Sequence, residues 1–121
     1  MSDSIVDWCV NFRASVAPKI LAFSFGDEQY ELGMSAQVTC IALEGDAPFD
    51  IRWTMQSRTH SAASTVESMA ARGITVTKIG AKSSVLQIDS IDAAHAGNYT
   101  CHVSNAVASR NYSAELDVVG P

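Results

Sequence analysis

The sequence predicts an all-β fold in which two antiparallel sheets pack as a sandwich, and three observations support this. Several short segments alternate apolar and polar side chains with a period of two, as in strands that are buried on one face. Glycine, proline, asparagine and aspartate residues between these segments mark turns. In the segment 91–101, Gly97 precedes Tyr99, which stands two residues before Cys101. This arrangement is typical of the corner at which a sandwich strand begins.

The composition limits the classes of function. The chain has 121 residues, of which 47% are hydrophobic, and this suits one domain with a core of ordinary size. Its net charge is -5 at pH 7. Nucleic-acid binding and electrostatic attachment to anionic lipids both need clustered Lys and Arg, so this charge argues against both.

The first residues differ in character from the rest of the chain, and we expect residues 1–17 to be a mobile leader and the domain to span 18–121. Asp3 and Asp7 stand where a signal peptide has positive residues, and no long apolar run comes after them. No apolar run in the chain is long enough to cross a bilayer. If the domain is of extracellular type, the lack of both an export signal and an anchor leads us to expect that it is part of a longer chain.

Two segments early in the domain are expected to be strands of one sheet. The run 20–25 is apolar and contains two aromatic residues, and Pro18 before it suits a strand at a sheet edge. Gly33 makes the turn into the next strand, 36–43. Alternation along that strand places Val38, Cys40 and Ala42 in the core and Gln37, Thr39 and Ile41 outside.

A turn over 44–48 leads into a strand whose core face carries Ile51, Trp53 and Met55. For the next residues, 57–73, the sequence does not decide between a helix, a loop and an edge strand. A capping-box pattern, an apolar stripe and a final glycine favour a short helix. A second edge strand fits the same residues.

Two more strands are predicted on either side of Gly80. Residues 74–79 are rich in β-branched side chains, which favour a strand. Residues 83–88 form the second strand, with Leu86 and Ile88 facing the core.

The last two strands come after the corner. Tyr99 and Cys101 face the core in the first of them, and a turn at 104–106 separates it from the final strand, about 109–119. One face of the final strand carries Tyr112, Ala114, Leu116 and Val118.

The cysteines are Cys9, Cys40 and Cys101. If two of them form a disulfide, one is left over. A disulfide indicates an oxidising compartment, whereas buried reduced cysteines fit a cytosolic protein. The residues alone leave both alternatives open, and they assign Cys9 no role.

The residues with the most specific spacing together resemble an I-set immunoglobulin domain over about 18–119. These residues are Cys40, Trp53, Leu86, Ile88, Gly97, Tyr99 and Cys101. The resemblance implies a disulfide between Cys40 and Cys101 that joins the two sheets, with the indole of Trp53 against it. His95 departs from the pattern, because an acidic residue usually stands there and pairs with a base near residues 74–79.

A narrower resemblance is to the Dscam family (Down syndrome cell adhesion molecule, arthropod form). It rests on the residues 18–28, 44–48, 95–101 and 112–116. The chain most resembles the variable seventh immunoglobulin domain of insect Dscam or the first domain of the shortened chelicerate forms. Residues 57–73 depart from that pattern.

This resemblance implies a domain of a longer adhesion receptor on the extracellular side of the plasma membrane. The receptor would mediate homophilic recognition between cells, in neuronal self-recognition, axon guidance and immunity. Such domains pair through the sheet lettered A-B-D-E, which here points to Gln37, Thr39, Ile41, Gln87 and Asp89. Ile41 is the strongest candidate, because an outward apolar side chain favours contact. The alternative is a structural spacer in a tandem array, on which this face is only solvated.

The sequence contains few other motifs for modification, catalysis or metal binding. Asn98-Tyr99-Thr100 and Asn111-Tyr112-Ser113 are sequons with outward asparagines, so Asn98 and Asn111 are candidates for N-glycosylation. No nucleophile elbow, phosphate loop or zinc-helix motif is present. The histidines His60, His95 and His102 give no sign of convergent metal ligands. We expect no enzyme activity, no cofactor and no metal.

Overall fold

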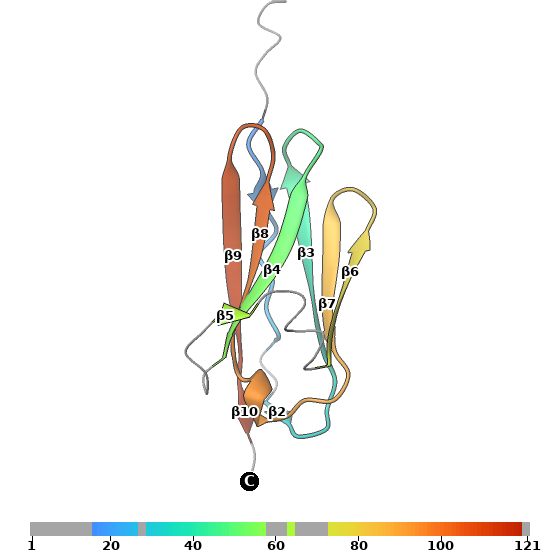
Figure 1. The fold of residues 1–121 in the computed structure, drawn as a ribbon, viewed down its shortest axis with the longest axis vertical. Helices are drawn as coiled ribbons and strands as arrows, with labels where there is room; N and C mark the ends of the chain where they lie inside the picture. The colour runs from blue at the N-terminus through green and yellow to red at the C-terminus, as the bar shows by residue number, and fades with distance from the viewer. Residues whose placement is uncertain (1–15, 27–28, 58–62, 65–72, 120–121) are drawn as a thin grey trace, which may run out of the picture.

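The structure is a computed structural model and describes residues 16–26, 29–57, 63–64 and 73–119. These residues form two four-stranded sheets and a two-stranded ribbon. The first sheet has the strand order β1-β3-β7-β6, the second sheet has the order β5-β4-β8-β9, and the ribbon pairs β10 with β2. Figure 1 shows the two sheets side by side as layers, which confirms the predicted sandwich.

The strands lie close to their predicted ranges over most of the chain. Their bounds are β1 Lys19–Ile20, β2 Tyr30–Glu31, β3 Ala36–Glu44, β4 Asp50–Ser57, β5 Ala63–Ser64, β6 Ile74–Ile79, β7 Ser83–Ile88, β8 Gly97–Ser104, β9 Ser109–Leu116 and β10 Val118–Val119, and a 3-10 turn, η1, spans Ala93–His95. Pairing within both sheets is antiparallel. The ribbon of β2 and β10 is parallel and was not predicted. The prediction of a single final strand over about 109–119 is therefore wrong, because β9 ends at Leu116 and the chain then pairs with β2 as β10.

The first strand is shorter than the apolar run 20–25 predicted. β1 ends at its second residue, so the expectation of one strand across this run is wrong. The reason is aromatic packing against the second sheet. The ring centroid of Phe23 lies 5.5 Å from that of Trp53, and the centroid of Phe25 lies 5.3 Å from that of Tyr99. The chain therefore leaves the edge of β3 and crosses to pair with β10 through β2.

The stretch 57–73, which the sequence left open, contains a short edge strand. β5 pairs antiparallel with β4 at residues 63–64, in agreement with the edge-strand alternative at that point. The helical alternative concerned residues that lie mostly outside the described part of the chain, so it stays a prediction.

A disulfide and a hydrogen bond join the two sheets next to each other. Cys40 of β3 is bonded to Cys101 of β8, as predicted, with the Cα atoms 6.4 Å apart. On β4, the indole Nε1–H of Trp53 donates to Ser84 Oγ of β7 at 3.0 Å. Cys40 lies opposite Ser84, and Trp53 lies opposite Cys101, on neighbouring strands. The two links therefore close a ring across the core.

The side chains around this ring are almost completely buried. Those exposed by at most 1% include Trp53, Met55, Leu86, Ile88, Tyr99, Val103 and Leu116. Burying one such side chain stabilises the fold by about 1.5–3 kcal/mol. The disulfide spans a sequence separation of 61 and adds roughly 4 kcal/mol in the chain-entropy account. The inward set predicted by alternation is confirmed at these positions.

Sequence reasoning missed the role of Ser84. A serine on the core side of β7 interrupts the apolar pattern, although it is only 3% exposed. Its hydroxyl accepts the buried indole N–H of Trp53. A buried donor without an acceptor costs about 1–3 kcal/mol, so this hydroxyl allows the indole to lie against the disulfide.

We expect Ser84→Ala to lower the free energy of unfolding by about 1–3 kcal/mol, because it leaves the Trp53 indole N–H buried without its acceptor. Urea denaturation of the oxidised chain measures the change. Ser83→Ala is the matched control, since Ser83 bonds the Ile79 carbonyl at the exposed surface and water can replace that bond. A Ser84→Ala variant as stable as the Ser83→Ala variant contradicts this account of the core.

Candidate functional site

The outer face of the first sheet is built from rows of side chains that lie opposite each other on β3, β7 and β6. Residues directly opposite on neighbouring strands share a face. The rows are Gln37–Gln87–Thr75, Thr39–Val85–Thr77 and Ile41–Ser83–Ile79. Leu43 extends the β3 side beyond the last row. We name these residues together the first-sheet face.

Apolar side chains gather at one end of the first-sheet face. Ile79 is 54% exposed and Leu43 is 48% exposed. Ile41 is half-buried and lies in the same row as Ile79, and Val85 stands in the next row. Large exposed apolar patches mark contact sites, so this end of the face is the candidate contact region.

The first-sheet face is uncharged, although the chain has a net charge of -5. Along the described strands β3, β6 and β7, none of the side chains in the three rows, nor Leu43, is ionisable. Asp89 lies at the rim, beyond the end of β7. Its Oδ1 accepts from Gln87 Nε2 at 3.2 Å, and its carbonyl accepts from Ser35 Oγ at 2.9 Å. Within the three rows, two copies of this face bring no charges together, and the charged residues Lys19, Glu44 and Asp89 lie at its margins.

The structure brings most of the predicted contact residues together. Gln37, Thr39, Ile41 and Gln87 lie on the first-sheet face, and Asp89 lies at its rim. The contributions of β6, of Val85 and of Leu43 were missed, because only part of the sheet was considered. The period of two in residues 74–79 was the signal that could have found Ile79 and the threonines.

The outer face of the second sheet has a different character. Its rows, which we name the second-sheet face, are Asp50–Ser104–Ser109, Arg52–His102–Asn111, Thr54–Thr100–Ser113 and Gln56–Asn98–Glu115. Polar bonds tie neighbours together. Arg52 Nε lies 2.8 Å from Asp50 Oδ2, and Thr54 Oγ1 lies 2.9 Å from His102 Nε2. This face is polar and carries charges of both signs.

Both sequons lie on the second-sheet face. Asn98 and Asn111 are exposed, so the prediction that both point outward is confirmed, while their glycosylation stays a prediction. The hydroxyls of the two sequons, on Thr100 and Ser113, are bonded to each other at 2.7 Å.

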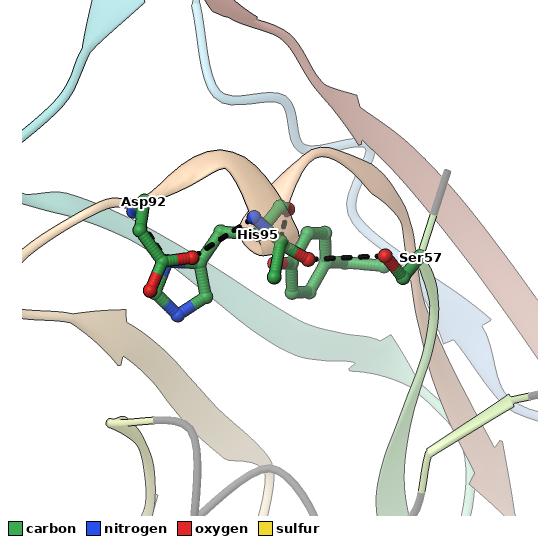
Figure 2. A network of polar contacts seen from close by, with 5 residues as sticks. Ser57, Asp92 and His95 are labelled. Carbon is green, nitrogen blue, oxygen red and sulfur yellow. Dashed lines mark hydrogen bonds and ion pairs between the residues drawn. The ribbon is translucent and has the colours of Figure 1, made fainter. Parts of the chain in front are cut away.

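The corner before β8 is held by a network that Figure 2 shows around Asp92, His95 and Ser57. Asp92 Oδ1 accepts from the Ala94 N–H at 2.9 Å, and His95 Nδ1 accepts from the Asp92 N–H at 2.8 Å. The Tyr99 hydroxyl donates to the His95 carbonyl at 2.6 Å. His95 therefore closes a capping box on η1, at the position where the resemblance leads one to expect an acid.

A serine, a histidine and an aspartate are the residue types of a hydrolytic triad, and the corner contains Ser57, His95 and Asp92. Their hydrogen bonds, however, hold the backbone of the corner in place. The Ser57 hydroxyl donates to the Ala94 carbonyl at 3.1 Å. Ser57 is 4% exposed and His95 is 1% exposed, so neither can meet a substrate. Gly97 completes the corner, because a Cβ there would collide with the carbonyl oxygen of Gln56.

The part of the chain that the structure describes offers neither a metal centre nor a membrane span built from a helix. There, no three side chains of the types His, Cys, Asp and Glu are grouped so that they could hold a metal ion. No helix among those residues has the length and apolar character needed to cross a membrane.

Known proteins share this geometry. A model of the immunoglobulin domain matches residues 17–105. The cell adhesion molecule Dscam1 of Drosophila melanogaster is 36% identical over 109 residues, which are 90% of this chain and 5% of Dscam1. The cell adhesion molecule DSCAM of Rattus norvegicus is 30% identical over 112 residues, 93% of this chain and 5% of DSCAM. The chain thus spans 5% of the length of these curated relatives.

Solved structures have the same fold. The crystal structure of the Dscam1 Ig7 domain, isoform 5, superposes with a TM-score of 0.75 at 36% identity, covering 88% of this chain and 100% of that one. The N-terminal eight Ig domains of DSCAM isoform 1.30.30 superpose with a TM-score of 0.74 at 33% identity, covering 88% of this chain and 13% of that one.

We expect Tyr99→Phe to lower the free energy of unfolding by about 1–3 kcal/mol, because it removes the buried donor to the His95 carbonyl. Tyr30→Phe is the control, since Tyr30 makes the equivalent bond to the Phe25 carbonyl at a half-buried site that water can reach. Thermal and urea unfolding of both variants check the difference. If both variants lost the same free energy of unfolding, the bond at the corner would contribute no more to stability than the half-buried one.

Proposed function

Because the chain belongs to the immunoglobulin domain family and is similar to the Dscam1 Ig7 domain along most of its length, we propose that it is a recognition module of a cell-surface adhesion receptor. In this proposal two copies bind each other through the first-sheet face. The module stands on the extracellular side of the plasma membrane, within a longer receptor. The disulfide between Cys40 and Cys101 agrees with that oxidising location.

The observation that carries the proposal is an uncharged surface with exposed apolar side chains at one end. Ile79 and Leu43 are about half exposed, at 54% and 48%, and Ile41 lies in the same row as Ile79, with Ser83 between them. Each gains roughly 25 cal/mol for every Å² of apolar surface that a partner covers. A specific interface buries about 800 Å² on each side, which is a scale suited to one sheet of a small domain.

The chemistry of the polar residues favours a second copy as the partner. An interface with two-fold symmetry brings the same patch from both copies together. A side chain on the two-fold axis meets its own counterpart and must both donate and accept hydrogen bonds, and side chains away from the axis meet other residues of the same patch. Gln, Thr and Ser side chains do both, and these are the polar types on the first-sheet face.

The second-sheet face is less suited to pairing with itself. It carries Asp50, Arg52 and Glu115, and a partner that covered these charges would have to compensate for the loss of their hydration. It also carries both sequons. A sugar on either asparagine would obstruct contact there, and this directs self-association to the first-sheet face. Roles in neuronal self-recognition and axon guidance are supported only by the resemblance to Dscam.

A second candidate function is that of a spacer in a tandem array, and the attachment of the chain at Val16 favours it. Val16 N–H donates to Asp46 Oδ2 at 2.8 Å, and the Val16 carbonyl accepts from Asn105 Nδ2 at 2.8 Å. These bonds fix the direction in which the chain enters the sandwich, at the end where Figure 1 shows the loops after β3 and β8. A spacer requires such a fixed direction but no contact through a sheet face.

A measurement of self-association distinguishes the recognition module from the spacer. We expect the oxidised, secreted chain to form concentration-dependent dimers, and we expect Ile41→Asp to weaken them about tenfold or more, by roughly 1.4 kcal/mol or more. The reason is that the aspartate brings two like charges into the interface. Sedimentation velocity across a concentration series measures the effect.

Ser109→Asp is the matched control, because it adds the same charge on the second-sheet face. It should leave the dimer unchanged. A chain that stays monomeric at high micromolar concentration, with no response to Ile41→Asp, favours the spacer.

A further inference from the structure

We propose that Asn111 carries an N-linked glycan and that the first sugars of this glycan lie in a pocket on the second-sheet face. The pocket has a volume of about 750 Å³, within the range of roughly 300–1,000 Å³ in which proteins hold small ligands. Asn111 itself lines it, together with Arg52, Thr54 and His102. The asparagine that would bear the sugar is therefore part of the wall of the pocket.

The side chains of the pocket fit a neutral polar ligand. Arg52 and Asp50, which lie on the second-sheet face, line it together. Asp50 already neutralises Arg52 across 2.8 Å, so the pocket does not present the concentrated positive charge that an anion needs. The hydroxyl of Thr54 and the imidazole of His102 add groups that can bond to sugar hydroxyls and to an N-acetyl group.

The register of the strands determines which side chains a sugar on Asn111 can contact. Asn111 lies opposite His102, and His102 lies opposite Arg52. Neighbouring strands are about 4.8 Å apart, so Arg52 stands roughly 10 Å from Asn111 across the sheet. A sugar attached to Asn111 Nδ2 that lies along this row crosses His102 and reaches Arg52 within its first residues.

Asn98 provides the contrast within the same sheet. It is also exposed and its sequon is also complete, but it stands in the row Gln56–Asn98–Glu115 and does not line this pocket. The proposed packing of sugars in this pocket therefore concerns Asn111 alone.

The modification is a simple group transfer. The donor is an oligosaccharide carried on a polyisoprenoid pyrophosphate. The secretory pathway supplies this donor and the transferase that recognises the Asn111-Tyr112-Ser113 sequon. Asn111 Nδ2 forms a bond to C1 of the first sugar, the bond from C1 to the pyrophosphate oxygen breaks, and the amide loses one proton. The lipid pyrophosphate leaves, and no atom is oxidised or reduced.

Occupancy is tested on the chain secreted from mammalian cells behind an added signal peptide. We expect mass spectrometry of peptides, before and after peptide-N-glycosidase F, to find the sugar on Asn111 in most chains. Asn111→Gln should remove this sugar and Asn98→Gln should leave it in place. Secreted chains that carry no sugar at Asn111 overturn the proposal.

Placement in the pocket is tested by the rate at which peptide-N-glycosidase F releases the sugar from the native chain. We expect release from Asn111 to become several-fold faster in Arg52→Ala, because the pocket then holds the sugar less well. Arg52 is largely exposed, with 74% of its side chain accessible, so this variant should fold. The denatured chains are the control, because release from them should be equally fast with and without the substitution.

Nuclear magnetic resonance gives a second measure of placement. When the glycan is trimmed to its first sugar, the imidazole signals of His102 should differ from those of the Asn111→Gln variant. Unchanged His102 signals together with an unchanged release rate in Arg52→Ala overturn the placement and leave the pocket open to another ligand. These measurements do not depend on self-association, so this proposal and the proposed function can fail separately.

Discussion

The fold depends on the ring of contacts formed by Cys40, Cys101, Trp53 and Ser84. The disulfide and the indole hydrogen bond each join one sheet to the other, and the same residues lie opposite one another within their own sheets. A disulfide alone fixes the separation of the two sheets at one point. The second link beside it also resists sliding and rotation of one sheet over the other, because both links must keep their geometry at the same time.

This constraint on the interior determines both outer faces. Successive side chains along a strand point to opposite sides, so a slip of one residue would exchange the core set for the surface set. With Cys40 held inside β3, its neighbours Thr39 and Ile41 must lie outside. With Trp53 held inside β4, Arg52 and Thr54 must lie outside. The uncharged first-sheet face and the polar second-sheet face are thus two consequences of the same buried ring.

Much of this could be predicted from sequence, because β3, β6, β7 and β8 are strands whose local alternation agrees with their tertiary environment. The predictions failed at positions whose structure depends on residues far away in the sequence. Phe23 leaves the first strand because its partner is the ring of Trp53 on the other sheet. Ser84 and His95 are buried because each meets one specific polar partner, and no pattern of hydrophobicity shows that. The rows of the outer faces likewise require the register between strands.

The division between core and faces has a consequence for recognition. Substitutions at exposed strand positions usually change stability by no more than about 0.5 kcal/mol, whereas the buried ring tolerates little change. Residues such as Gln37, Thr75 and Thr77 can therefore vary while the sandwich keeps its shape. In an interface with two-fold symmetry the patch must be complementary to itself, so a change in one side chain alters the contacts made in both copies and with them the specificity. A rigid interior with variable, uncharged rows is thus a physical basis on which closely similar domains could each prefer their own kind.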